Sequence, residues 1–115
     1  MLIQNKDLAI SKVEKNKGGI GISKMIHITD NAGLCDKGRL YAMMELEPGC
    51  SVGSHVHEND FEIYYFLEGE GEVTDDNEVK KVKAGDVMIT HEGHEHSLKN
   101  IGDSVFKWMA LILYV

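Results

Sequence analysis

The chain has 115 residues, 43% hydrophobic and 27% charged, and a formal net charge of −7 at pH 7. This composition predicts one globular domain over residues 1–115 and excludes an intrinsically disordered chain. Arg39 is the only arginine among the twelve basic residues, which argues against a nucleic-acid partner. The sequence has no apolar run of membrane-spanning length and no apolar N-terminal core typical of a signal peptide, so we expect a cytoplasmic protein with no membrane partner.

Short segments of alternating apolar and polar residues predict strands rather than helices. Residues 20–29 repeat isoleucine with a period of two, and residues 39–47 form a second such segment, which a Pro-Gly turn ends. Residues 62–74 form a third segment, in which Gly69 and Gly71 indicate a bend or bulge.

The remaining segments continue this pattern. Residues 75–77 predict a hairpin turn into a strand segment over residues 78–90, and residues 104–115 are long enough to cross a whole sheet. Twelve glycines and a single proline fit a chain of many tight turns. The sequence therefore predicts an all-β domain, either a sandwich or a closed barrel.

Three potential metal ligands lie in the stretch GCSVGSHVHENDFEIYYFLEG, residues 49–69. His55 and His57 project from the same face of an extended strand, a spacing that suits two imidazoles on one ion. We expect the polar turn at residues 58–60 to reverse the chain and lay Glu62 beside this pair on a neighbouring antiparallel strand. Residues on both faces of the following apolar segment are expected to be buried, and a buried carboxylate needs a partner such as a cation.

A second histidine cluster lies in residues 85–100, which contain His91, His94 and His96. Five of the six histidines of the chain therefore fall in two short segments. A lone histidine is usually solvated or hydrogen-bonded, but this concentration, together with a glutamate, favours a metal site.

These two segments resemble the two motifs of the cupin superfamily. The first motif, G-x5-H-x-H-x3,4-E-x6-G, is matched with every spacing intact by Gly49, His55, His57, Glu62 and Gly69. The second motif, G-x5-P-x-G-x2-H-x3-N, is matched by Gly85, Gly93, His96 and Asn100, with His91 in place of the proline.

The resemblance implies a jelly-roll β-barrel, the double-stranded β-helix, with a metal ion inside. By carry-over from the motifs, the ligands would be His55, His57, Glu62 and His96. Three imidazoles and one carboxylate suit one divalent transition ion, Mn, Fe, Ni, Cu or Zn, and leave positions open for water or substrate.

Two residues are candidates for acid–base catalysis, His91 and Tyr64. His91 is either a group that serves the site or a partly exposed loop histidine, and the same alternatives hold for His94. Asn100 is expected to act as a turn residue.

Several apolar side chains are expected to surround the site, either in contact with a ligand or as core packing. They are Tyr41, Met43, Tyr64, Phe66, Phe106, Trp108 and Ala110, the last three facing inward because Lys107 faces water. The position of Arg39 at the start of a strand makes a role in the cavity doubtful, which weakens an oxalate-decarboxylase interpretation.

Three functions remain compatible with this sequence: a metal-dependent enzyme of oxygenase, isomerase or decarboxylase type acting on a small molecule, a metal-containing module that binds a sugar or carboxylic acid without turnover, and a structural cupin. Catalysis requires a titratable group near the open positions of the metal, whereas a structural role requires a filled coordination sphere. The apolar N-terminal strand and C-terminus predict a homodimer.

Overall fold

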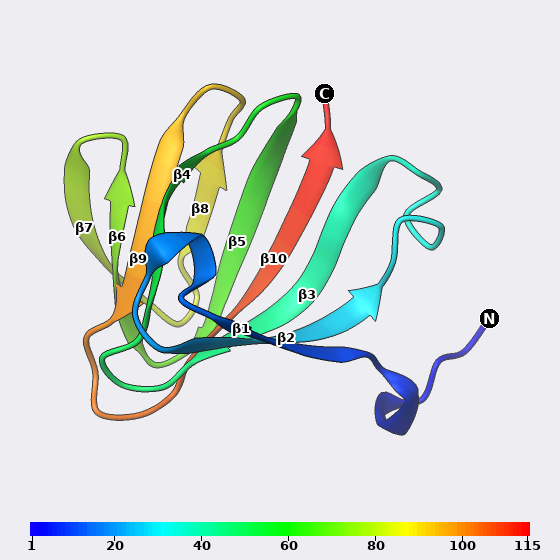
Figure 1. The fold of residues 1–115 in the computed structure, drawn as a ribbon, viewed down its shortest axis with the longest axis horizontal. Coiled ribbons are helices and arrows are strands. Elements are labelled where there is room, and N and C mark those ends of the chain that lie inside the picture. Colours follow the sequence, from blue (N-terminus) through cyan, green and yellow to red (C-terminus); the bar gives the residue numbers. More distant parts are fainter.

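Antiparallel strands dominate the computed structural model, which describes residues 1–115 (Figure 1). The strands are β1 (Ile10–Glu14), β2 (Ile22–Thr29), β3 (Gly38–Leu46), β4 (Ser51–Val56), β5 (Asp60–Glu68), β6 (Glu70–Asp75), β7 (Glu78–Lys83), β8 (Val87–Thr90), β9 (Glu95–Asn100) and β10 (Phe106–Tyr114). Two short 3-10 helices, η1 (Asn5–Asp7) and η2 (Asn16–Gly18), lie near the N-terminus. Neither helix has the length and apolar character needed to cross a membrane.

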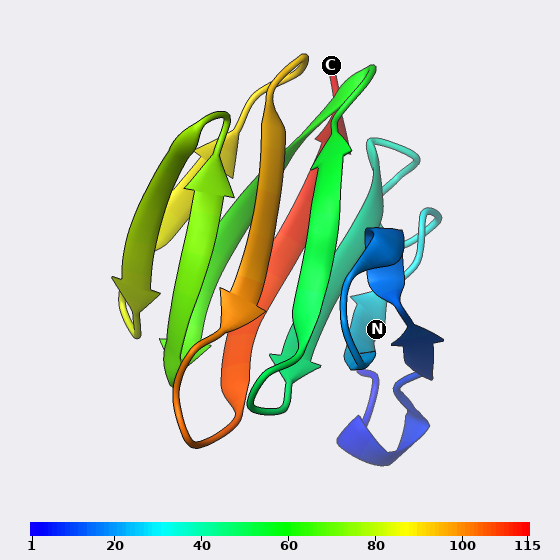
Figure 2. The same ribbon diagram turned by 60° about the vertical axis from the view of Figure 1, so that its left-hand side comes forward.

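The strands form two facing sheets. The larger sheet has the order β1-β2-β3-β10-β5-β8, and the smaller has the order β4-β9-β6-β7. Figure 2 shows the smaller sheet in front of the larger one, with the interior between them. This architecture confirms the predicted all-β fold of jelly-roll type.

Two glycines lie at two of the turns where the chain passes from one sheet to the other. Gly69 (φ +84°) lies between β5 and β6, and Gly85 (φ +96°) lies between β7 and β8. Side chains rarely adopt such positive φ values, so glycine suits both turns. The segments expected at residues 62–74 and 78–90 are therefore two strands each, and the predicted bend is a change of sheet.

Aromatic packing fills the interior between the sheets. Phe66, Phe106 and Trp108 are fully buried, and the rings of Phe66 and Phe106 stack with their centroids 5.5 Å apart. Ala110 is also buried, which confirms the inward set predicted for the last strand. Asn100 is buried and organises the β9–β10 turn, where its side chain donates to the carbonyl of Ser104 and accepts from the N–H of Gly102.

Two expectations about side-chain direction are wrong. On β3 the inward residues include Ala42 and Met44, so Tyr41 and Met43 lie half-buried on the opposite face. On β5 the face opposite Glu62 is not buried, because Tyr65 is 49% exposed and Leu67 39% exposed. The outer face of the larger sheet is therefore apolar and partly open to solvent.

Candidate metal centre

A β-bulge in β4 turns His55, and His57 just after the strand, into the barrel. Val52 pairs with Leu98 of β9, but His55 pairs with His96, so β4 advances three residues while β9 advances two. Val52 is buried, and without the extra residue strict alternation would turn His55 and His57 outward. The bulge reverses the parity, which leaves Val56 47% exposed and His57 only 2% exposed.

Glu62 reaches the histidines from the opposite sheet. It lies on β5, whereas β4 pairs with β9 in the smaller sheet. The expectation that the turn at residues 58–60 lays Glu62 on a strand neighbouring the histidine pair is therefore wrong, because this turn carries the chain across the barrel. Glu62 is 4% exposed and faces the histidines through the interior.

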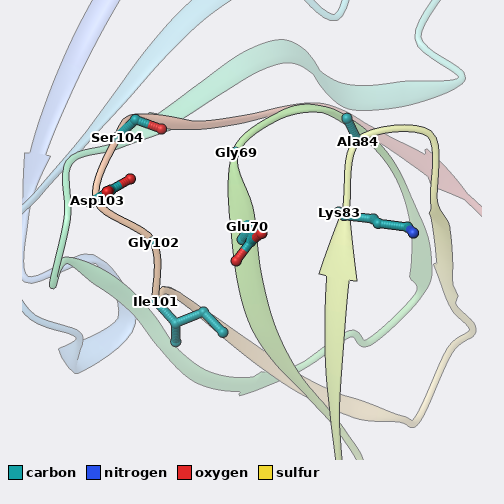
Figure 3. A pocket seen from close by; sticks show the side chains of 8 residues that line it. All are labelled: Gly69, Glu70, Lys83, Ala84, Ile101, Gly102, Asp103 and Ser104. Atoms are coloured by element: carbon teal, nitrogen blue, oxygen red, sulfur yellow. The ribbon is translucent and has the colours of Figure 1, made fainter.

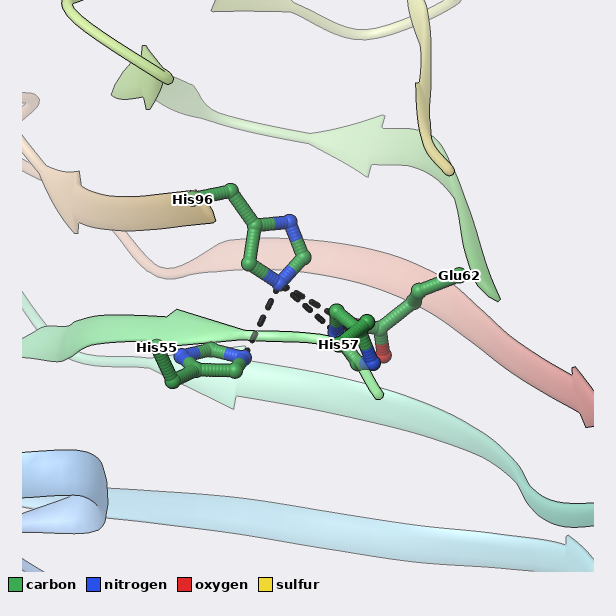
Figure 4. A group of neighbouring side chains, drawn as sticks. All are labelled: His55, His57, Glu62 and His96. Atoms are coloured by element: carbon green, nitrogen blue, oxygen red, sulfur yellow. Dashed lines mark hydrogen bonds and ion pairs between the residues drawn. The ribbon is translucent and has the colours of Figure 1, made fainter. Parts of the chain in front are cut away.

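The structure brings four predicted ligands together at one point (Figure 4). The Nε2 atom of His96 lies 2.9 Å from that of His55 and 3.1 Å from that of His57. One carboxylate oxygen of Glu62 lies 3.0 Å from Nε2 of His57 and 3.1 Å from Nε2 of His96. The ligand atoms of all four residues lie within 4.8 Å of one another.

Hydrogen bonds on the outer side of the rings orient them. The Nδ1–H of His55 donates to the carbonyl of Gly53 (2.8 Å), and the Nδ1–H of His57 donates to the Asp60 carboxylate (2.8 Å). Because these partners only accept, each ring keeps its proton on Nδ1, and when it is neutral it turns an Nε2 lone pair toward the cluster. His96 Nδ1 lies 2.8 Å from the Thr90 hydroxyl, which can accept or donate.

The electrostatics of the cluster favour a charged carboxylate between basic rings. Burial alone would raise the pKa of Glu62, but hydrogen bonding to His57 and His96 outweighs it and lowers the pKa to about 2. The hydrogen bond that Glu62 accepts from His57 raises the pKa of His57, whereas burial lowers the pKa of His55. The cluster therefore holds one fixed negative charge in a dry setting, which a cation can balance.

The donor set meets the geometric requirements of a transition-metal site. Two ligands at about 2.1 Å from one ion and at right angles to each other are about 3 Å apart, and the neighbouring donor atoms of the cluster are separated by 2.9–3.1 Å. Imidazole nitrogens with one carboxylate suit the borderline transition ions better than Mg or Ca. The residues could therefore hold such an ion.

A cavity of about 90 Å³ adjoins the cluster. His55, His57 and Glu62 line it, together with Tyr64, Met44 and Arg39. The expectation that Arg39 has no role in the cavity is wrong, because Arg39 lines it although the residue lies near the start of β3. Asn16 and Lys17 of η2 also contribute to the wall.

The two candidate acid–base residues are placed differently. Tyr64 is 4% exposed, lines the cavity and stacks on the ring of His96 at 5.2 Å between centroids. Burial raises its pKa well above the usual value, so the phenol stays neutral and can donate a hydrogen bond.

His91 is exposed in the β8–β9 loop, with its ring 6.5 Å from that of Phe61, and does not reach the cluster. His94 is also exposed and pairs with Asp76.

Three residues around the cluster carried no recognisable signal in the sequence. No spacing rule places these residues at the cluster. Asp60 contacts the His57 ring, Thr90 contacts the His96 ring, and Arg39 lines the cavity. Asp60 belongs to a segment that reads as an ordinary polar turn, so only the folded chain reveals its contact with His57.

A larger hollow lies elsewhere on the molecule. It has a volume of about 770 Å³ and is formed by the turns that link β5 to β6, β7 to β8 and β9 to β10 (Figure 3). Glu70, Lys83 and Asp103 line this open hollow, and none of them is buried. It lacks the convergent buried groups of the cavity beside the histidines.

Comparisons with known proteins agree with this fold. The model of the cupin domain family matches residues 42–112. The chain is 38% identical over 113 residues to an oxalate-binding protein of Thermotoga maritima, covering 98% of this chain and 93% of that protein. The chain therefore belongs to the cupin family.

Solved structures give the same result. The crystal structure of a predicted oxalate decarboxylase from Thermotoga maritima has a TM-score of 0.95 and 37% identity, with complete coverage of both chains. The polyketide cyclase RemF from Streptomyces resistomycificus has a TM-score of 0.78 at 17% identity, covering 99% of this chain and 78% of that one. The second likeness concerns the fold alone.

Proposed function

We propose that the protein binds one divalent transition ion (Mn, Fe, Ni, Cu or Zn) through His55, His57, Glu62 and His96, and takes a carboxylate of the size of oxalate as its ligand. One observation carries the proposal: the four donor side chains converge beside a small cavity that Arg39 also lines. When bound, the ion would supply a Lewis acid with open positions for a carboxylate oxygen.

Arg39 supports a negatively charged ligand. Its Nε–H donates to Asp60 over 2.7 Å, which uses one of the five N–H donors of the guanidinium. The terminal NH₂ groups remain available, and a planar guanidinium matches the geometry of a carboxylate. It is the only arginine of the chain, so no other residue supplies this fork.

The volume of the cavity supports a very small ligand. About 90 Å³ is several times the roughly 10–15 Å³ that a cavity needs to hold one water molecule. Pockets for drug-sized ligands measure about 300–1,000 Å³. A dicarboxylate of two carbons fits this space better than a sugar ring, and the similarity to the oxalate-binding protein of Thermotoga maritima points to the same ligand class.

Calorimetric titration of oxalate into Mn(II)-loaded protein tests this proposal. The wild type is expected to bind oxalate, and Arg39→Gln is expected to bind it at least tenfold more weakly with unchanged metal content. Lys107→Gln is the matched control, because Lys107 pairs with Glu45 and Glu68, away from the cavity, and it should bind as the wild type does. Metal-loaded wild type that binds no oxalate would contradict the ligand assignment.

Turnover of the same ligand is the second candidate function. It is favoured by Tyr64, whose neutral phenol lines the cavity and could donate a hydrogen bond to a bound carboxylate as it reacts. NMR analysis of metal-loaded protein with ¹³C-oxalate separates the two functions, because unchanged oxalate supports a binding module and labelled formate with carbon dioxide supports a decarboxylase. If turnover occurs, Tyr64→Phe should lower kcat with little change in oxalate affinity.

We also propose that the protein is a homodimer that pairs through the outer face of the larger sheet. On β5 and β8 this face exposes four large apolar residues, Tyr65, Leu67, Val87 and Ile89. Tyr65 lies opposite Val87 in the strand pairing, so these side chains are neighbours. An exposed apolar patch on a sheet is typical of a surface that a second protein covers.

A further inference from the structure

We propose that Asp60 is a positioning residue that couples the anion-binding arginine to the metal site. Its two carboxylate oxygens serve two different partners: Oδ1 accepts from Nδ1 of His57 (2.8 Å), and Oδ2 accepts from Nε of Arg39 (2.7 Å). The inference rests on the proposed metal and carboxylate binding, and it assigns the role of linking them to a residue that neither cupin motif specifies.

Asp60 is built into the interior rather than placed on the surface. It is 3% exposed, and it lies at the first position of β5, two residues before Glu62. A buried carboxylate is costly unless it is paired. Arg39 supplies the compensating charge and His57 the second hydrogen bond, so the three side chains form one continuous chain from the cavity wall to the cluster.

The three histidines of the cluster differ in their outer partners. His55 donates to a neutral backbone carbonyl, and His96 contacts a neutral hydroxyl. Only His57 donates to a carboxylate. A carboxylate acceptor fixes the tautomer and makes the opposite ring nitrogen a stronger donor to a metal. Asp60 therefore makes His57 the strongest imidazole donor of the set.

Replacing Asp60 by asparagine exposes this role, because an asparagine has one acceptor oxygen for two donors. The bond to the Arg39 guanidinium is charge-assisted and takes that oxygen. The NH₂ group then faces Nδ1 of His57, which must accept, so the proton moves to Nε2. A protonated Nε2 points at the cluster and cannot bind a metal.

The test measures the dissociation constant for Co(II) by competition with a chromophoric chelator. Asp60→Asn is expected to weaken Co(II) binding about 10- to 100-fold and to change the d–d absorption spectrum of the bound ion. The double variant Asp60→Asn/Arg39→Met is expected to recover most of the affinity, because without Arg39 the asparagine oxygen is free to accept from His57. A merely structural role of Asp60 predicts no recovery on a second substitution.

Asp76→Asn is the matched control. Asp76 accepts from Nδ1 of His94 at 2.6 Å, but this pair is exposed and His94 is outside the cluster. The control should bind Co(II) with the affinity and spectrum of the wild type. The inference is overturned if Asp60→Asn stays within twofold of the wild type, if Asp76→Asn weakens binding equally, or if the double variant remains as weak as Asp60→Asn. Wild type that binds no Co(II) would overturn the proposed function itself, and this inference with it.

Discussion

Glu62 is the side chain whose surroundings differ most from those of a free carboxylate. It is 4% exposed, and the hydrogen bonds to His57 and His96 lower its pKa from 4.5 to about 2. A depressed folded-state pKa contributes stability that is present above the unfolded-state pKa and is lost as the pH falls through the folded-state value. The relevant window therefore runs from about pH 4.5 down to about pH 2.

The first prediction concerns this acid window. In metal-free protein prepared with a chelator, ionised Glu62 is expected to contribute about 3 kcal/mol to the free energy of unfolding above pH 4.5, at about 1.4 kcal/mol for each unit of pKa shift. Urea unfolding at steps between pH 5 and pH 2 measures the loss. Glu62→Gln should flatten the slope of stability against pH in this window. An unchanged slope in the variant would contradict the assigned environment of Glu62.

Single residues show how far the sequence predicts this site. His55, His57 and Glu62 have the local spacing of one motif and His96 that of a second, and the structure brings all four together. The partners Asp60 and Arg39 could not be found in this way, because they are 21 positions apart and meet only when the chain folds. His91 occupies a motif position, yet its loop turns it to solvent.

At the scale of elements, η2 closes the barrel beside the cavity. It packs against β4 through Gly53, where an added Cβ would lie 2.0 Å from the carbonyl oxygen of Lys17. This approach is possible only without a side chain at position 53. Asn16 and Lys17 thereby line the cavity, so the contact between η2 and β4 shapes the site from the N-terminal segment.

The second prediction is that Gly53→Ala displaces η2. The added methyl group must push the backbone of Lys17 away, which is expected to lower the free energy of unfolding by about 1–3 kcal/mol and to weaken oxalate binding. Chemical denaturation and calorimetry measure the two effects. Gly102→Ala is the control, because its nearest neighbours lie at 3.5–3.8 Å, and it should change stability by less than about 0.5 kcal/mol. Equal effects of the two substitutions would contradict the account of η2.

Strands β4 and β3 show why side-chain direction was harder to predict than strand position. The segments expected around residues 20–29, 39–47 and 104–115 are strands, because alternation and turn residues are local signals. The bulge in β4 depends on pairing with β9, a distant partner, and it alone gives the histidines their inward direction. On β3 the middle of both faces is apolar, and only the charged Arg39 and Glu45 at the two ends distinguish the face of Tyr41 and Met43 from the inward one.

At the scale of the whole molecule, the two faces of the larger sheet differ. The inner face packs the aromatic core, and the outer face carries exposed apolar residues on β5 and β8. Turn spacing and the two motifs were sufficient to predict the fold class. The sequence could not predict which apolar surface stays exposed, because exposure depends on how both sheets close.

The third prediction is a dimer in solution. Light scattering after size exclusion should give about twice the 12.8 kDa of one chain, and Tyr65→Lys should shift the protein toward the monomer, because it places a charge in the apolar contact. Val79→Lys is the control, since Val79 is 62% exposed on β7 of the smaller sheet, and it should stay dimeric. A monomeric wild type would overturn the dimer, and a dimeric Tyr65→Lys would move the contact to another surface.

The central claim is that side chains from three strands and the loop after β4 share one cation. Anomalous diffraction from crystals of the metal-loaded protein tests it most directly. The account predicts a single strong peak about 2.0–2.3 Å from Nε2 of His55, His57 and His96 and from a carboxylate oxygen of Glu62. A crystal that contains a stoichiometric ion with no peak among these four side chains would contradict it.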